Sequence, residues 1–240
     1  MNICGFVPQS TVDYPDHISA VVFTSPCNFN CGFCYNSQFI RHAPPVLSVP
    51  ALLVELKKRK KFLDAVVITG GEPTLQKDLE SVIRKIRALG LKVKLDTNGY
   101  RPKVLRRLLT KNLVDYVAMD VKAPLKKYAA VVGRNINLGH IRESITALCD
   151  WDGDYEFRTT VLPEFTQGDI RDIAWLLCYP ALYIAGSKNT VAKRYVLQAF
   201  LPTHAKGLKY RRETATAKGT LQKWKIMLQS KYAATQFEVR

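Results

Sequence analysis

The chain has 240 residues, which suits one domain or one domain with an appendage. Hydrophobic residues make up 47%, as in ordinary globular proteins, and the absence of any run of about eighteen apolar residues excludes a membrane-spanning helix. The formal net charge of +16 favours an acidic partner such as nucleic acid, an anionic membrane or an acidic protein, although solubility alone also accounts for it. The N-terminus lacks the features of a signal peptide, so we expect a cytoplasmic protein with reduced thiols.

Predicted strands and helices alternate along the chain. After an extended opening segment over residues 2–18, strands are predicted at residues 19–24, 65–69, 91–95, 116–120, 155–161 and 195–200. Helices are predicted at residues 50–63, 76–89, 102–113, 136–149 and 169–184. Such alternation implies a parallel sheet, and six units are too few for a closed eightfold barrel. We therefore expect an α/β fold of the partial (β/α)6 TIM-like barrel type.

The tail from residue 204 has a different character. It is rich in Lys and Arg, and residues 221–228 predict one amphipathic helix. The sequence is therefore divided into a domain over residues 1–203 and a basic C-terminal extension over residues 204–240.

Three cysteines, Cys27, Cys31 and Cys34, fall within eight residues after the strand at 19–24. A structural zinc would need a fourth nearby Cys or His, and none follows at a usual spacing. An iron–sulfur cluster is ordinarily held by four thiolates, so three leave one iron open to a ligand that is not protein. An open metal position is typical of a catalytic site. Zinc and unliganded core cysteines are the alternatives.

The other three cysteines, Cys4, Cys149 and Cys178, have no metal-site spacing. We expect them to be packed thiols that behave as apolar side chains.

Polar groups follow the C-terminal ends of four predicted strands. The cysteines follow the first, residues 70–72 (Gly-Gly-Glu) the second, residues 96–99 (Asp-Thr-Asn-Gly) the third, and Asp120 with Lys122 the fourth. In barrels of parallel strands this rim carries the catalytic loops. Taken singly, these segments are also consistent with tight turns and a surface ion pair. Their shared placement favours a functional site.

The pattern Cys27-x-x-x-Cys31-x-Phe33-Cys34 resembles the signature of the radical S-adenosylmethionine (SAM) enzymes. In that family SAM binds the open iron of a [4Fe-4S] cluster through its amino and carboxylate groups. The resemblance covers roughly residues 3–203 and implies a radical SAM partial barrel. It also implies that Phe33 belongs to the SAM site and that Gly70, Gly71 and Glu72 line the SAM methionine.

The segments at residues 95–99 (Leu-Asp-Thr-Asn-Gly) and 120–122 (Asp-Val-Lys) are similar to those of the glycyl-radical enzyme activating enzymes. This resemblance implies that Lys122 pairs with the SAM carboxylate and that Asp96 and Asn98 lie at the SAM site. It further implies a monovalent cation, Na⁺ or K⁺, held by Asp96, Asp120 and a backbone carbonyl near Thr97.

Three further residues are assigned less directly. Val161 and Gln198 flank the adenine on the resemblance alone. Arg158 lies on the strand at residues 155–161, where it serves either the same rim or a charge pair inside the barrel.

The opening residues Gly5-Phe6, Ser10 and Asp13-Tyr14-Pro15 are similar to those of the anaerobic ribonucleoside-triphosphate reductase activating proteins. The implied partners are a glycyl-radical enzyme, the large subunit of that reductase, and a flavodoxin- or ferredoxin-type electron donor. Tyr35 departs from the family, which often has His there, and residues beyond 203 match no pattern of it. The stretch Tyr35–Thr69 contains no Cys, so there is no insert for a second cluster.

Three functions therefore stand side by side. The first is an activating enzyme that cleaves SAM and generates a glycyl radical on a partner. The second is a radical SAM enzyme acting on a small molecule or an RNA base, which the positive charge favours. The third is a zinc-stabilised nucleic-acid-binding module without catalysis.

Overall fold

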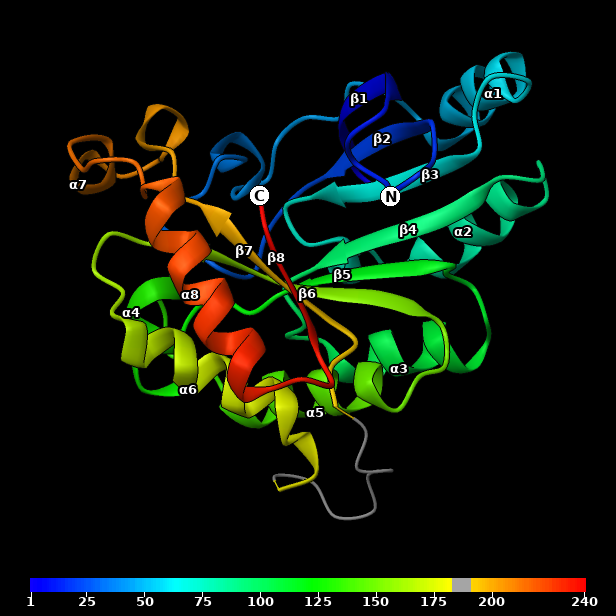
Figure 1. The fold of residues 1–240 in the computed structure, drawn as a ribbon. Helices are drawn as coiled ribbons and strands as arrows, with labels where there is room; N and C mark the ends of the chain where they lie inside the picture. The colour runs from blue at the N-terminus through cyan, green and yellow to red at the C-terminus, as the bar shows by residue number, and fades with distance from the viewer. Residues whose placement is uncertain (183–190) are drawn as a thin grey trace. The chain divides into compact units, whose positions relative to one another are not determined.

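The computed structural model describes residues 1–182 and 191–240. In these ranges eight strands are hydrogen-bonded in chain order, from β1 to β8 (Figure 1). The chain divides into two compact units. Unit 1 comprises Met1–Asn28, Asn36–Thr97 and Lys103–Ala118, and unit 2 comprises Phe29–Tyr35, Asn98–Pro102 and Met119–Arg240.

The strands of unit 1 are β1 (Ile3–Ser10), β2 (Ser19–Thr24), β3 (Ala65–Gly70), β4 (Lys92–Thr97) and the first three residues of β5 (Tyr116–Asp120). β1 runs antiparallel to β2, whereas β2, β3 and β4 are parallel. In the register, Val21 lies opposite Val67 and Val66 lies opposite Val93. All four valines are buried. Burial on both faces explains why β3 is a continuous apolar run.

Unit 1 also contains α1 (Val49–Arg59), α2 (Leu79–Arg87) and α3 (Pro102–Thr110) apart from its first residue. Ser48 caps α1, because its hydroxyl accepts a hydrogen bond from the Ala51 amide at 3.3 Å. The apolar residues of α2 share one face, which is buried and packs on β4. Gly90 follows with φ of +85°, the left-handed conformation that glycine adopts after helices.

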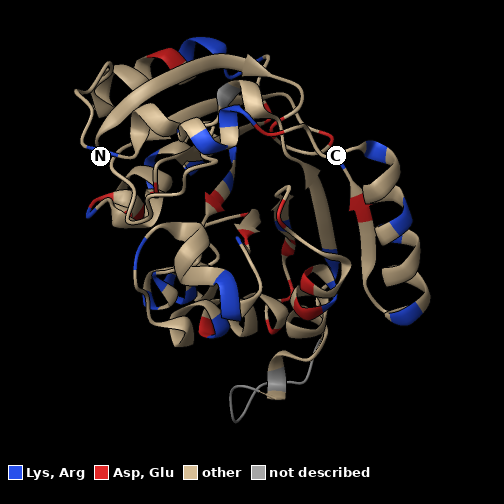
Figure 2. Cartoon of the chain, turned by 90° about the vertical axis from the view of Figure 1, so that its left-hand side faces the viewer, with Lys and Arg blue, Asp and Glu red and all other residues tan. Residues whose placement is uncertain are grey.

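Unit 2 contains the end of β5, followed by β6 (Asp154–Val161), β7 (Arg194–Ala199) and β8 (Gln236–Val239), the last three parallel to one another. Its helices are α4 (Tyr128–Val132), α5 (Leu138–Cys149), α6 (Gln167–Cys178), α7 (Leu208–Arg211) and α8 (Lys218–Lys231). α8 packs along β7 and β8 (Figure 1). Figure 2 shows basic residues along α8, where Lys218, Lys223 and Lys231 are exposed.

The six predicted strands are confirmed, and the structure adds two. The opening segment is not merely extended, because Ile3–Ser10 pairs with β2. The four-residue strand β8 was not predicted, and residues 204–240 form α7, α8 and β8. The helix predicted at 169–184 ends at Cys178, and residues 183–184 lie outside the described ranges. None of the described helices has both the length and the apolar character needed to cross a bilayer.

Candidate active site

The cysteine loop begins directly after β2. In unit 1, the Cys27 amide donates to the Ile40 carbonyl at 3.0 Å. In unit 2, the Cys34 amide donates to the Cys31 carbonyl at 3.3 Å, and Cys31 is buried whereas Cys34 is partly exposed. None of the six cysteines, all of which are described, forms a disulfide. The three loop sulfurs are therefore chemically able to act as thiolate ligands.

A search of residues 1–182 and 191–240 finds no three Cys, His, Asp or Glu side chains gathered as ligands of a single metal ion. In a cubane cluster each thiolate binds a different iron, so its ligands do not converge on one point as those of zinc do.

The two glycines after β3 let its backbone approach the start of the cysteine loop. Gly70 has φ of +110°, which favours glycine. A Cβ on Gly71 would lie 2.5 Å from the Pro26 carbonyl oxygen and 2.7 Å from that of Phe39. The Gly71 amide donates to the Thr24 carbonyl at 2.6 Å. These contacts fix residues 70–72 against residues 24–26 within unit 1.

The Glu72 side chain is fully buried and hydrogen-bonded. Its Oε1 accepts from the Thr74 amide at 3.1 Å, from the Thr74 hydroxyl at 2.5 Å and from the Thr97 hydroxyl at 2.7 Å. This carboxylate therefore ties the end of β3 to the end of β4. The backbone of residues 70–72, rather than the Glu72 carboxylate, is the part suited to contact a ligand.

Asp96, at the end of β4, is paired with a lysine that the sequence analysis did not consider. Lys94 is only 3% exposed, and its Nζ lies 3.0 Å from Oδ1 of Asp96. The same Nζ donates to the Asp13 carbonyl at 2.5 Å. A buried ammonium thus offsets the charge of Asp96 and ties β4 to the opening segment.

Asn98 and Gly99 form a tight turn in unit 2. Oδ1 of Asn98 accepts from the Tyr100 amide at 3.0 Å, a local bond typical of Asn in turns. Gly99 has φ of +72°, and a Cβ there would lie 2.1 Å from Cε of Met119. The Gly99 carbonyl accepts from the Ser144 hydroxyl at 2.5 Å. The turn is therefore fixed on β5 and α5.

Asp120, at the end of β5, forms ion pairs with two cations. Its Oδ2 lies 2.8 Å from Nζ of Lys122, and its Oδ1 lies 2.8 Å from Nε of Arg158. Burial alone would raise the pKa of the Asp120 carboxyl, but the charges of Arg158 and Lys122 outweigh it and lower that pKa to about 2. Burial opposes the charge of Lys122, but Asp120 and the nearby cysteines raise its pKa. Both groups are therefore charged at neutral pH.

The remaining predicted residues lie in unit 2, Phe33 in the cysteine loop and the others on β6 and β7. Nζ of Lys122 lies 5.9 Å from the ring centroid of Phe33, within the range of a cation–π contact. Val161, at the end of β6, is fully buried. Gln198 lies on β7 opposite Thr160, and Val161 lies opposite Ala199. Unit 2 thus brings Phe33, Lys122, Asp120 and Arg158 into one chain of contacts.

Sequence reasoning missed two groups that this geometry includes. Lys94 alternates with Asp96 on β4, so the two-residue period of the strand was a usable signal. Tyr210 lies in the tail, which matched no known pattern, yet its ring lies 6.0 Å from that of Phe33. No local sequence signal predicts that contact, because the two residues are far apart in the chain.

A family profile described as Radical SAM superfamily matches residues 21–177. The chain belongs to the radical SAM superfamily. The cofactors of this superfamily are a [4Fe-4S] cluster and SAM, and they are the cofactors of this chain. The expected family, the [4Fe-4S] cluster and SAM are confirmed.

Curated relatives indicate which branch of the superfamily this chain is similar to. A protein of Methanocaldococcus jannaschii, provisionally named a glycyl-radical enzyme activating enzyme, is 38% identical over 178 residues, which cover 72% of this chain and 73% of that protein. A protein of Saccharolobus solfataricus, provisionally named a GTP 3′,8-cyclase, is 33% identical over 105 residues, covering 43% of this chain but 34% of that protein. The first match places the chain in the family of glycyl-radical enzyme activating enzymes.

Solved structures confirm the fold. Streptococcus suis SuiB bound to its precursor peptide superposes with a TM-score of 0.70 at 13% identity, over 92% of this chain and 48% of SuiB. The enzyme anSMEcpe with bound SAM gives a TM-score of 0.60 at 14% identity, over 90% of this chain and 61% of that chain. The chain thus spans about half to two thirds of these proteins. The expected α/β class with a partial TIM-like barrel is confirmed.

The residues present fit the two cofactors. The loop carries three thiols without disulfides and has no fourth Cys, which suits a cluster with one iron left for SAM. A Cβ on Gly71 would collide with backbone oxygens, so only glycine fits at this position of the turn. Lys122 offers a fixed ammonium to an anionic group.

Proposed function

We propose that this radical SAM enzyme is an activating enzyme that generates a glycyl radical on a partner protein. The observation that carries the proposal is the 38% identity to the M. jannaschii protein, which extends over nearly three quarters of both chains. The segments at residues 95–99 and 120–122, similar to those of activating enzymes, support it independently of the cysteine motif.

When bound, the cluster and SAM would supply radical chemistry: an electron from an external donor would cleave SAM reductively, and the hydrogen abstracted would come from the partner's glycine. Cys27, Cys31 and Cys34 would hold the cluster through their thiolates. The other residues of the site would bind SAM, orient it and exclude water.

Lys122 is the residue proposed to bind the SAM carboxylate. An ammonium has three N–H donors, and Asp120 receives one of them at 2.8 Å. The ring of Phe33 lies on another side of the same ammonium. Asp120 and Phe33 would therefore orient Lys122, while Arg158 holds Asp120 ionised.

The SAM ammonium is proposed to bind the backbone carbonyls of residues 70–72, since the Glu72 carboxylate is engaged by Thr74 and Thr97. Asn98 is proposed to lie at the methionine side of SAM, and Val161 and Gln198 at the adenine. A monovalent cation at Asp96, Thr97 and Asp120 stays a prediction, and SAM binding measured with and without K⁺ tests it. Lys94 and Arg158 already supply positive charge to the two carboxylates.

The partner is proposed to be the large subunit of an anaerobic ribonucleotide reductase, and the electron donor a flavodoxin- or ferredoxin-type protein. The net charge of +16 would favour association with whichever of these proteins presents an acidic surface.

A second candidate is radical chemistry on a small molecule. The match to the S. solfataricus protein supports it, but that match spans only 43% of this chain. The activating enzyme is therefore the better-supported function.

The test uses anaerobically reconstituted enzyme, SAM, a low-potential reductant and the reductase subunit encoded by the same genome. We expect 5′-deoxyadenosine, methionine and the doublet electron paramagnetic resonance (EPR) signal of a glycyl radical on the partner. Cys31→Ala should abolish all three together with the cluster. Release of 5′-deoxyadenosine without a protein radical, in the presence of a small molecule that is consumed, would favour the second candidate.

A further inference from the structure

The chain after β7 crosses the cysteine loop. We call residues 200–216 the cover segment. The Gly207 amide donates to the Gly32 carbonyl at 2.7 Å, and Gly32 lies between Cys31 and Cys34. Nζ of Lys206 donates to Oδ1 of Asn30 in the same loop. All these residues belong to unit 2. The backbone between two of the cluster ligands is therefore bound by a part of the chain that lies far away in sequence.

Tyr210 provides the packing of this contact. A Cβ added to Gly32 would lie 2.9 Å from Cε2 and 3.0 Å from Cδ2 of the Tyr210 ring, so the ring lies against the bare Gly32 backbone. The ring also makes an edge contact with Phe33 at 6.0 Å. Tyr210 is 9% exposed. Its hydroxyl donates to Oε1 of Glu164 at 2.7 Å, which fixes the ring's direction.

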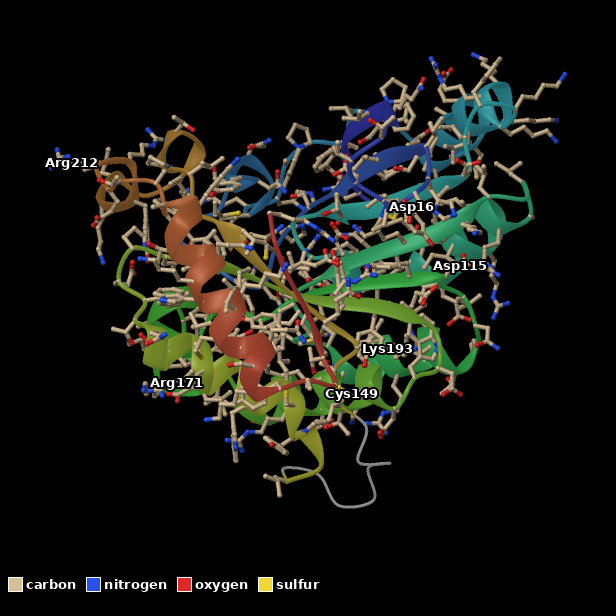
Figure 3. The ribbon with its side chains drawn as sticks, in the orientation of Figure 1. Asp16, Asp115, Cys149, Arg171, Lys193 and Arg212 are labelled. Carbon is tan, nitrogen blue, oxygen red and sulfur yellow. The ribbon has the colours of Figure 1, made fainter. Side chains whose placement is uncertain are left out.

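Both sides of the loop are held. On one side the Asn30 amide donates to the Val132 carbonyl at the end of α4, at 2.9 Å. On the other, the Tyr35 hydroxyl accepts from the Leu201 amide at 2.5 Å, where the cover segment begins. The cover segment itself is anchored at its far end, because the Thr216 hydroxyl donates to the Val161 carbonyl at 2.6 Å. Figure 3 shows Arg212 just after α7, at the outer edge of unit 2.

We propose that Tyr210 is a positioning residue for the cluster: it holds Gly32, and with it Cys31 and Cys34, in the cluster-binding arrangement and screens this side of the cluster from solvent. Tyr35, where the family often has His, anchors the same loop to the start of the cover segment. The proposal rests on the cluster of the superfamily and not on the glycyl-radical substrate.

A purely structural role would be the alternative, in which Tyr210 stabilises unit 2 and nothing more. Tyr232 offers the matched control, because it is also a buried tyrosine of unit 2, 7% exposed, and packs against Phe237 and Tyr179. Substituting Tyr232 removes a similar ring without touching the cysteine loop.

The experiment measures how fast the reconstituted cluster loses iron to an Fe(II) chelator under anaerobic conditions, together with the EPR spectrum of the reduced cluster. In Tyr210→Ala we expect loss at least about tenfold faster than in the wild type, because local opening of the loop costs less free energy. The EPR line shape should also change. Tyr210→Phe keeps the ring and should lose iron at nearly the wild-type rate. Tyr232→Ala should lower the melting temperature without changing either cluster readout.

A double-mutant cycle keeps the test valid if Tyr210→Ala folds poorly. Gly32→Ala should speed iron loss in the wild type, because its methyl group pushes against the Tyr210 ring. In the Tyr210→Leu background the same change should have a much smaller effect, since contacting residues couple. Equal effects of Gly32→Ala in both backgrounds, or wild-type cluster lifetimes in Tyr210→Ala, would overturn the proposal while leaving SAM cleavage on a partner glycine open.

Discussion

The six cysteines of this radical SAM enzyme occupy two chemical environments. Cys27 and Cys34 are partly exposed, whereas Cys31 of the same loop and Cys4, Cys149 and Cys178 outside it are buried. Burial raises the pKa of Cys149 to about 12 and raises those of Cys4 and Cys178. In Figure 3 Cys149 lies far from Arg212, the residue that follows helix α7 of the cover segment. Burial thus favours the protonated form of the three thiols outside the loop.

This difference predicts the order of alkylation in the anaerobic apoprotein. A raised pKa lowers the thiolate fraction, which for a pKa of about 12 is on the order of 10⁻⁴ at pH 8, and only the thiolate reacts. Iodoacetamide at pH 8 should therefore modify Cys27 and Cys34 well before Cys149, as read by peptide mass spectrometry. Protein unfolded in guanidinium is the control, in which all six should react alike. Equal rates for Cys149 and Cys34 in the folded protein would contradict this assignment.

A measurement of SAM affinity tests the proposed role of Lys122 directly. Lys122→Met removes an ammonium proposed to bind the SAM carboxylate, so SAM affinity should fall roughly 10- to 100-fold, the value of a charge-assisted hydrogen bond of about 1.5–3 kcal/mol. Iron content should not change. Lys126→Met is the control, because Lys126 is exposed and pairs with Asp172. Unchanged SAM affinity in Lys122→Met, measured by calorimetry, would remove Lys122 from the site.

Among the elements, the turn after β3 depends most strictly on its residue types. Gly71→Ala places a methyl group 2.5–2.7 Å from two backbone oxygens, which cannot move aside as a side chain can. We expect destabilisation of about 1–3 kcal/mol, as for overpacking in a close-packed region, seen as a lower urea midpoint. Gly219→Ala in α8 is the control: nothing lies within 4 Å of its new methyl group, and alanine favours the helix. Equal midpoints for both variants would show that the turn tolerates a side chain.

An ion pair next to the last strand, β8, adds to its pairing with β7. Glu156 on β6 is fully buried, and its two oxygens lie 2.8 and 3.0 Å from the guanidinium of Arg240. Arg240→Ala would leave a buried carboxylate without this partner, so we expect a loss of about 2–3 kcal/mol, less than for a fully buried pair because Arg240 is 39% exposed. Adding Glu156→Gln should recover part of the loss. Urea unfolding of the apoprotein measures both, and no loss in Arg240→Ala would contradict the pairing.

These elements differ in how far the sequence predicts them. Strand β3 is buried on both faces, so Val66, Val67 and Ile68 form a run that identifies it locally. Strand β8 has only four residues, and what fixes it is its pairing with β7 together with the contact of the adjacent Arg240 with the distant Glu156. The cysteines were predictable because their chemistry requires a fixed spacing. The role of Tyr210 was not, because it comes from a contact with Gly32 that no local pattern records, whereas the two-residue period of β4 places Lys94 beside Asp96.

At the scale of the whole molecule, the chain is a radical SAM enzyme, and its partner is proposed to be a glycyl-radical enzyme. The net charge of +16 suits an acidic protein partner, and it suits nucleic acid equally well. Charge therefore does not distinguish the candidate substrates. The origin of the abstracted hydrogen atom distinguishes them, because an activating enzyme takes it from a glycine of the partner.

The most direct measurement follows that hydrogen. The reductase subunit is prepared with α-deuterated glycine and incubated with the reconstituted enzyme, SAM and reductant under anaerobic conditions. We predict 5′-deoxyadenosine that carries deuterium, together with a glycyl-radical EPR signal on the partner. Unlabelled 5′-deoxyadenosine and a partner without a radical, at full iron loading of the enzyme, would contradict the proposed function.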